Sequence, residues 1–440
     1  MKIKYLAQDE NDLTNLVSTY KGKLGAQEVL DSLGAHPVLE MISDSSQVTD
    51  SMLIENVNAA IESYKFWKNF KKKDFPFSYF LNYVLPYRVG LEEINDWRSY
   101  FRIRYSNYLS TFAMRELSTK QIYKIINDEL TGTSQYVMIR KPHLNKPAIN
   151  QTASQIIKTR VPFDCEDYAI RSMYVFRSMG IPTAYEKIPL WGKFNYGHAQ
   201  EAILFENNKF YPVFAGDTVP FKYQIAKMYR RTFEHVVSPL DQIIESGEKK
   251  QDIPEYFNFS NFIDITNERT PVSNIRCKLR SSQFNVLYLC VYNDGQWRPL
   301  AWSKLDASTQ SVTFLNMGRK ILYHLASFKD GRLNLIDGPF LLNTEGATSY
   351  LVKTKLPNTS FTFFESDRNE VIKPKATYTL FYWDRIKQNW IAIETKRAIS
   401  SSLIFNNVPV NILLKLEAEN PILSSNVRPF VIEDNQQIWW

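Results

Sequence analysis

Three residues in the middle of the chain are of the types that carry out thiol chemistry. Cys165 lies in the run Val-Pro-Phe-Asp-Cys-Glu-Asp-Tyr, His198 follows 33 residues later in Gly-His-Ala, and Asp217 follows 19 residues after that in Gly-Asp-Thr. A thiol nucleophile needs a base that takes its proton and a group that orients the base. We therefore expect a Cys165 thiolate to attack an amide or peptide carbonyl, with His198 as base and Asp217 fixing the imidazole tautomer.

The position of Cys165 at the start of a predicted helix favours a reactive thiol. Asp164 is suited to cap the helix, apolar residues recur from Cys165 to Met179, and Gly180-Ile181-Pro182 is a typical helix end. Main-chain N–H groups and the positive end of the helix dipole lower the pKa of a thiol in the first turn and can hold an oxyanion. The two acidic residues that follow the cysteine are expected to point away from the sulfur.

Two strand-like runs follow this helix. His198 opens an apolar run from 199 to 205, and a second run from 210 to 215 ends shortly before Asp217. The polar segment 206–209 between them is typical of a turn, so we expect adjacent antiparallel strands. Such a pair would bring His198 and Asp217 close together.

A helix-borne Cys that faces a strand-borne His and Asp resembles the papain-type arrangement. Residues from about 120 to 225 resemble the transglutaminase-like superfamily of papain-fold thiol enzymes, in which a short Gly-Ile-Pro segment often ends the nucleophile helix, as Gly180-Ile181-Pro182 does here. The resemblance implies a thioester intermediate. Water as acceptor would make the protein an amidase, peptidase or deamidase, which we rank first, and an amine would make it a protein crosslinker.

Four further residues are candidates for the oxyanion hole or the substrate groove. Gln155 is included because a side-chain amide upstream of the nucleophile commonly fills the oxyanion role. Gln200 is included because it departs from the family pattern at the wall of the groove, where many relatives carry an aromatic residue soon after the His. The four candidates are Gln155, Asp164, Trp191 and Gln200.

A different class of function remains open, in which the same fold has lost catalysis. The protein would then bind a glycan, a peptide or a partner protein through β-sandwich modules in its C-terminal half. The hypothesis of a binding protein predicts an unreactive Cys165 and exposed aromatic rings on those modules. The hypothesis of an enzyme predicts a Cys165 thiol of low pKa beside a substrate groove. A lone cysteine in an apolar segment can also be an inert core residue.

The C-terminal half contains an internal repeat with an offset of about 90 residues. The matched positions are Trp297 with Trp390, Phe314 with Phe405, Ile321-Leu322 with Ile412-Leu413, and Pro339-Phe340 with Pro429-Phe430. Short alternating runs over about 90 residues are the size of a β-sandwich module. We therefore expect two tandem β-sandwiches.

The chain has 440 residues, of which 44% are hydrophobic, so we expect several domains in an α+β protein. Residues 1–115 are expected to form a helical N-terminal region that packs on the core. Residues 116–255 would form the transglutaminase-like catalytic domain, and 258–345 and 346–440 the two β-sandwich modules.

The net charge of +7 comes from 53 basic and 46 acidic residues spread along the chain. The densest basic segment, 65–73, is predicted to be the end of an amphipathic helix whose apolar positions are Ile54, Val57, Ile61 and Tyr64. No nucleic-acid-binding motif accompanies this segment.

The partners expected for the chain are amide substrates in proteins, peptides, cell walls or glycoproteins, with possible glycan contact through the modules. We expect no metal, no cofactor, no nucleic acid and no transmembrane segment. The first residues turn polar too soon for a signal peptide. The family resemblance suggests export to the periplasm or the cell surface. Cys277 and Cys290 could pair or stay buried.

Overall fold

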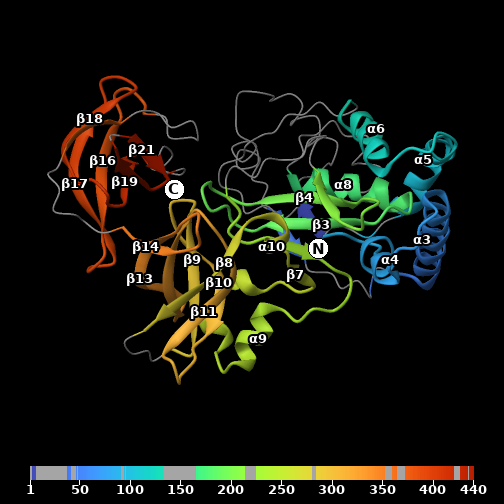
Figure 1. Ribbon diagram of the computed structural model, residues 1–440, viewed down its shortest axis with the longest axis horizontal. Helices are drawn as coiled ribbons and strands as arrows, with labels where there is room; N and C mark the ends of the chain where they lie inside the picture. Colours follow the sequence, from blue (N-terminus) through green and yellow to red (C-terminus); the bar gives the residue numbers. More distant parts are fainter. Residues whose placement is uncertain are drawn as a thin grey trace. The chain divides into compact units, whose positions relative to one another are not determined.

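The structure is a computed structural model, and Figure 1 shows its helices and strands. It describes residues 2–5, 37–40, 46, 48–90, 94, 96–132, 165–213, 224–279, 284–351, 359–363, 372–420, 427–434 and 436–440. Helices prevail before residue 180 and antiparallel strands after it, which confirms the α+β class and the β-rich C-terminal region. The chain divides into two compact units, Met1–Tyr185 with Ala199–Val219, and Glu186–His198 with Pro220–Trp440.

Up to residue 180 the first unit is built mainly from helices, with one short strand pair that the sequence analysis did not predict. Strands β1 and β2 pair antiparallel. The elements are β1 (Lys2–Tyr5), β2 (Pro37–Glu40), α3 (Asp50–Lys71), α4 (Phe77–Tyr83), α5 (Trp97–Met114), α6 (Thr119–Gly132) and α8 (Cys165–Ser178).

Helix α3 confirms the predicted helix, but its buried face overlaps the predicted one only in part, at Tyr64. Ile54 is 60% exposed, whereas Trp67, which the sequence places among the lysines, is 1% exposed. The side chain of Thr49 caps the N-terminus, and Lys72 takes a left-handed conformation at the C-terminus. Lys71 donates to the Leu117 carbonyl and pairs with Glu206. The basic segment 65–73 is therefore the packed end of a helix.

Helix α8 ends as the Gly-Ile-Pro segment predicts. The Gly180 amide donates to the Arg177 carbonyl and the Ile181 amide to the Phe176 carbonyl, which is the Schellman pattern. Gly180 has a φ of +80°, and a Cβ there would lie 2.2 Å from the main-chain oxygen of Ser63 in α3. Only glycine fits this close approach of α3 to the end of α8.

A buried arginine organises the Leu-Pro-Tyr-Arg segment 85–88. Arg98 in α5 is 2% exposed and donates to the carbonyls of Val84, Leu85 and Pro86, and to that of Arg177 in α8. A buried guanidinium needs several acceptors, so these bonds tie the segment to both helices.

The predicted strand pair near the candidate site is present. Strand β4 (His198–Leu204) pairs antiparallel with β5 (Phe210–Val213), from Glu201 opposite Val213 to Leu204 opposite Phe210. The connection turns at the expected polar segment, where the Phe205 amide donates to the Lys209 carbonyl.

The second unit begins with the end of β3 (Thr183–Ile188), which pairs with β6 (Tyr229–Arg231), and β6 pairs with β7 (Phe262–Asp264). Helices α9 (Pro239–Glu245) and α10 (Thr266–Arg269) and the 3₁₀ turns η2 (Lys250–Asp252) and η3 (Glu255–Phe257) lie between and after these strands.

The remaining strands form two β modules with the same pairing order. In β module 1 a five-stranded sheet runs β10-β9-β12-β13-β14 and a two-stranded sheet pairs β11 with β8. In β module 2 the orders are β17-β16-β19-β20-β21 and β15 with β18. Strand for strand the two are equivalent, which confirms the internal repeat.

The strands of β module 1 are β8 (Val272–Lys278), β9 (Val286–Asn293), β10 (Gln296–Lys304), β11 (Ser311–Gly318), β12 (Ile321–Lys329), β13 (Arg332–Leu342) and β14 (Thr348–Tyr350). Those of β module 2 are β15 (Thr359–Phe363), β16 (Thr377–Asp384), β17 (Asn389–Arg397), β18 (Leu403–Val408), β19 (Leu414–Ala418), β20 (Phe430–Glu433) and β21 (Gln436–Trp439). Strand β14 lies just past the predicted boundary at 345 and pairs with β13.

Each module has a core shared by its two sheets, as in a sandwich. In β module 1, Phe314 of the small sheet packs in one cluster with Leu289 and Tyr323 of the large sheet. In β module 2, Phe363 and Phe405 pack with Leu414 in the same way. Within the part of the chain that the structure describes, no helix is long and apolar enough to cross a membrane.

Candidate active site

Cys165 is the first residue of α8, and its thiol contacts the beginning of β4. The Ala199 amide donates to Cys165 Sγ at 3.4 Å, and Ala199 is bonded directly to His198. A sulfur in the first turn of a 14-residue helix lies at the positive end of the helix dipole. Glu166 accepts a hydrogen bond from the Tyr185 hydroxyl at 2.9 Å. A helix N-terminus in general favours the ionised form of a thiol, whereas a neighbouring carboxylate opposes it.

His198 opens β4 and is half-buried. Its ring stacks on that of Trp191, with centroids 5.7 Å apart and planes at 26°. Burial lowers the pKa of His198 to about 4, so the imidazole is neutral at pH 7. A neutral imidazole can accept a proton, but the burial that lowers its pKa also makes it a weaker base than an ordinary histidine.

The other candidates from the sequence fall in different places. Trp191 is 4% exposed and forms the stack just described. Gln200 is fully buried in β4. Asp217, which follows β5 along the chain, lies outside the described residues, and so do Gln155 and Asp164. The three-residue constellation therefore stays a prediction.

The loop that leads into His198, residues 191–197, is anchored by a side chain from β module 1. Asn293, the last residue of β9, is 1% exposed. Its Nδ2 donates to the carbonyls of Trp191, Phe194 and Tyr196, and its Oδ1 accepts from the Tyr196 amide at 2.8 Å. The two N–H protons are shared among three carbonyls, so this one side chain contacts four main-chain groups of the loop.

A side chain from β module 2 anchors the same loop. Arg428, which precedes β20, is 5% exposed and donates to the Gly192 carbonyl at 2.9 Å and to Asn195 Oδ1 at 3.2 Å. It also donates to the Tyr292 carbonyl and, at 2.8 Å, to the Trp440 carbonyl. Sequence reasoning missed both anchors, because a lone polar residue at a strand end reads as a surface position.

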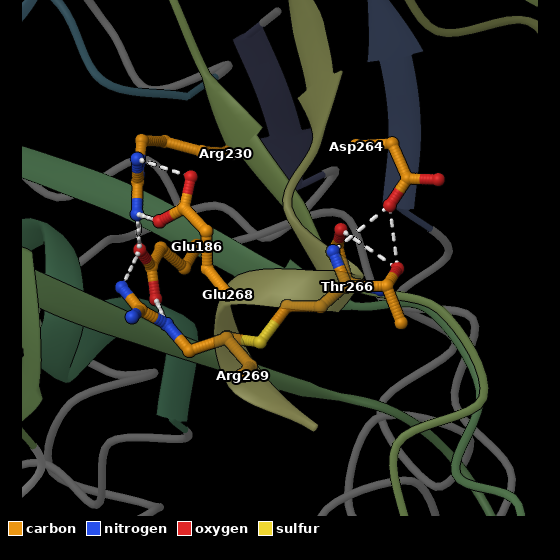
Figure 2. A network of polar contacts seen from close by, with 7 residues as sticks. Glu186, Arg230, Asp264, Thr266, Glu268 and Arg269 are labelled. Carbon is orange, nitrogen blue, oxygen red and sulfur yellow. Dashed lines mark hydrogen bonds and ion pairs between the residues drawn. The ribbon is translucent and has the colours of Figure 1, made fainter. Parts of the chain in front are cut away.

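The strand before the loop is held by a buried charge cluster, shown in Figure 2. Glu186 in β3 is fully buried and accepts from Arg230 at 2.7 Å and from Arg269 at 2.5 Å. Glu268 binds Arg230 at 2.7 Å from the other side. The two carboxylates and two guanidinium groups offset each other, which is how buried charges become tolerable. The cluster fixes β3 against β6 and α10.

A second titratable group lies on β4, at Glu201. It is fully buried, and burial raises the pKa of its carboxyl to about 8. Glu201 is therefore mostly protonated at pH 7. It opposes Val213 across the β4–β5 pair, three positions along the strand from His198.

The remaining cysteines differ from Cys165. Cys277 and Cys290 both carry free thiols, and burial raises the pKa of each, that of Cys277 to about 12. Among the described residues no group of His, Cys, Asp and Glu side chains is arranged to hold a metal ion.

Comparison with known proteins adds no family. No protein-family model and no curated protein matches the chain. The crystal structure of a tetra-tandem repeat in the extending region of a large adhesion protein is similar at a TM-score of 0.11 and 7% sequence identity, over 56% of this chain and 64% of that chain. A likeness this low carries no argument about fold or function.

Proposed function

We propose that this protein is a thiol-dependent acyl-transfer enzyme of transglutaminase-like type, which hydrolyses an amide or peptide bond through Cys165 and His198, with Asp217 as the orienting carboxylate. The observation that carries the proposal is the hydrogen bond from the Ala199 amide to Cys165 Sγ. This hydrogen bond joins the first turn of α8 to Ala199, the residue that is bonded to His198.

The proposed reaction has two halves. In the first, His198 takes the thiol proton, Cys165 Sγ bonds to the carbonyl carbon, and the carbonyl oxygen becomes an oxyanion near the N-terminus of α8. The C–N bond then breaks, and the imidazolium protonates the departing amine. In the second half, His198 takes a proton from water, hydroxide attacks the thioester carbon, and the thiol leaves with its proton restored.

The pKa of about 4 leaves the His198 imidazole neutral at pH 7, as a general base must be, but it also makes the imidazole a weaker base, so the proposal rests on the position of Cys165 and not on this pKa. Substrates of the class proposed are amides in proteins, peptides, cell walls or glycoproteins. An amine in place of water would give the crosslinking reaction through the same thioester.

The rival proposal is a binding protein whose site has lost catalysis. This rival hypothesis predicts exposed aromatic rings on the β modules. In the described part of those modules, the exposed large aromatic side chain is Tyr350, and Arg385 lies over its ring. Trp297 and Trp383 are buried instead. We therefore treat the rival as the negative outcome of the test that follows.

The test is the rate at which iodoacetamide alkylates Cys165 as a function of pH, read by peptide mass spectrometry. We expect rapid labelling well below pH 8 in the wild type, and a loss of about tenfold or more at pH 7 in His198→Ala. The peptides that contain Cys277 and Cys290 serve as internal references, since burial keeps those thiols protonated.

The matched control is His235→Ala, which removes an exposed histidine of the second unit. It should label Cys165 at the wild-type rate. Slow labelling that is identical in the wild type and His198→Ala would overturn the enzyme proposal and favour the binding protein.

A further inference from the structure

The loop 191–197 receives anchors from two places that the sequence separates by about 100 and 230 residues. Asn293 belongs to β module 1 and Arg428 to β module 2. We propose that Arg428 and Asn293 are positioning residues, which hold this loop and thereby set the place of the His198 imidazole. The proposal rests on the proposed function, and it makes the β modules part of the active site.

The contacts of Arg428 argue for a clamp. Its guanidinium reaches the loop at Gly192, Phe194 and Asn195, the end of β9 at the Tyr292 carbonyl, and the Trp440 carbonyl. A guanidinium has five N–H donors in a rigid fork, so it can tie several segments in one fixed geometry. Lysine carries three donors on a single flexible nitrogen and cannot reproduce that geometry.

Asn293 holds the same loop 191–197 through contacts of its own. Besides its four bonds to the loop, its neighbour Asp294 donates its amide to Asn195 Oδ1 at 2.9 Å. Asn195 is 2% exposed, and its Oδ1 accepts hydrogen bonds from both modules, from Arg428 and from the Asp294 amide. A buried side chain shared in this way couples the two anchors.

The loop 191–197 has little room to move, because other parts of the chain lie close to its main chain. A Cβ at Gly197 would lie 2.3 Å from the Pro189 main-chain oxygen, and one at Gly192 would lie 2.5 Å from the side chain of Ile321. The Gly192 amide also donates to the Gln224 carbonyl. Main chain that is enclosed on several sides passes a displacement on to its neighbours.

The two ends of the loop bear directly on His198. Trp191, its first residue, stacks on the imidazole, and Gly197, its last residue, is bonded to His198. Release of the clamp would therefore shift both the ring that covers the imidazole and the main chain that carries it. Misplacement of a catalytic group by about 1 Å can cost about a hundredfold in rate.

The experiment compares the full chain carrying Arg428→Met with the wild type by three measurements. The first is the NMR titration of His198, assigned by its loss in His198→Ala. The second is hydrogen exchange of the 191–198 peptide. The third is the pH profile of Cys165 alkylation. Arg385→Met, which removes an exposed arginine of the same module, is the matched control.

We expect Arg428→Met to expose the imidazole, so that the pKa of His198 rises from about 4 by at least about one unit toward its usual 6.5. Exchange of the 191–198 amides should accelerate about tenfold or more. Alkylation at pH 7 should slow by roughly tenfold. Arg385→Met should leave all three at wild-type values.

A folded Arg428→Met protein with the wild-type His198 titration and wild-type exchange would overturn the proposal. If that variant does not fold, Asn195→Ala decides the question, because it removes the acceptor shared by Arg428 and the Asp294 amide. Failure of the enzyme proposal looks different. His198→Ala would then leave alkylation unchanged, while titration and exchange still decide whether the clamp exists.

Discussion

Glu201 shows how burial alone can set the charge of a residue beside the candidate site. It sits in the middle of β4, fully out of contact with solvent, and burial raises the pKa of its carboxyl from 4.5 to about 8. In the unfolded chain the same carboxyl ionises near pH 4.5. Between these two values the unfolded chain holds fewer protons than the folded one, so stability falls as pH rises.

Glu201→Gln should remove this dependence, because glutamine has nearly the same shape and does not titrate. We expect the stability of the variant relative to the wild type to grow from pH 4.5 to pH 8 at up to about 1.4 kcal/mol per pH unit, and to level off above pH 8. The total is roughly 2–5 kcal/mol. Urea unfolding of both proteins across this range measures it.

The control for this comparison is Glu345→Gln, at an exposed position in β module 1. Its unfolding free energy should track that of the wild type at every pH. Parallel curves for Glu201→Gln and the wild type would contradict the prediction and would mean that the Glu201 carboxyl ionises in the folded state.

At the scale of secondary-structure elements, Gly180 decides how closely α3 and α8 approach. It supplies the left-handed residue that ends α8 and leaves room for the main chain of Ser63. Since α8 begins at Cys165, the fit at its far end helps fix the axis along which the thiol is presented.

Gly180→Ala should destabilise the protein by more than about 1 kcal/mol, because the left-handed φ and the contact with the Ser63 oxygen both oppose a Cβ. Gly247→Ala is the matched control, since Gly247 also has a positive φ of +101° but no atom within 4 Å of a Cβ. It should feel only the conformational penalty. Equal losses in urea unfolding would show that the helix contact contributes nothing.

At the scale of the whole molecule, the two β modules share an aromatic cluster. Trp297 of β module 1 lies 6.1 Å from Trp383 of β module 2 between ring centroids, and Trp383 Nε1 donates to the Gly338 carbonyl at 3.3 Å. The buried ring of His324 lies 5.4 Å from Trp383. Cores that join in this way tend to unfold together.

Trp383→Ala should therefore weaken both modules. We expect a loss of about 3–5 kcal/mol for the buried indole, and faster hydrogen exchange in β9 and β12 of β module 1 as well as in β16 and β19. The control is Trp439→Ala, whose ring packs on Phe430 inside β module 2. It should loosen β module 2 alone. Faster exchange confined to β module 2 in both variants would contradict the coupling.

Some of these features could be predicted from the sequence because they depend on near neighbours. The start of α8 at Cys165, its end at Gly180 and the β4–β5 hairpin follow from helix periodicity, a left-handed glycine and a polar turn. The internal repeat was visible because equivalent strands keep equivalent apolar residues, such as Phe314 and Phe405.

Other features were out of reach because they depend on contacts between distant segments. The apolar positions of α3 indicated a helix, yet Ile54 is exposed and Trp67 is buried, since the buried face depends on where α5 and α8 pack. The strands β1 and β2 were missed for a different reason, because four residues each are too few to show a clear alternating pattern.

The sequence by itself determined the elements that carry the candidate chemistry, namely a cysteine at a helix start and a histidine at a strand start. Only the tertiary structure decided what surrounds them. Arg428 and Asn293 reach the His198 loop from the β modules, and Glu201 keeps its proton inside β4. Local signals fix φ and ψ over a few residues, whereas burial and long-range hydrogen bonds exist only once the chain has folded.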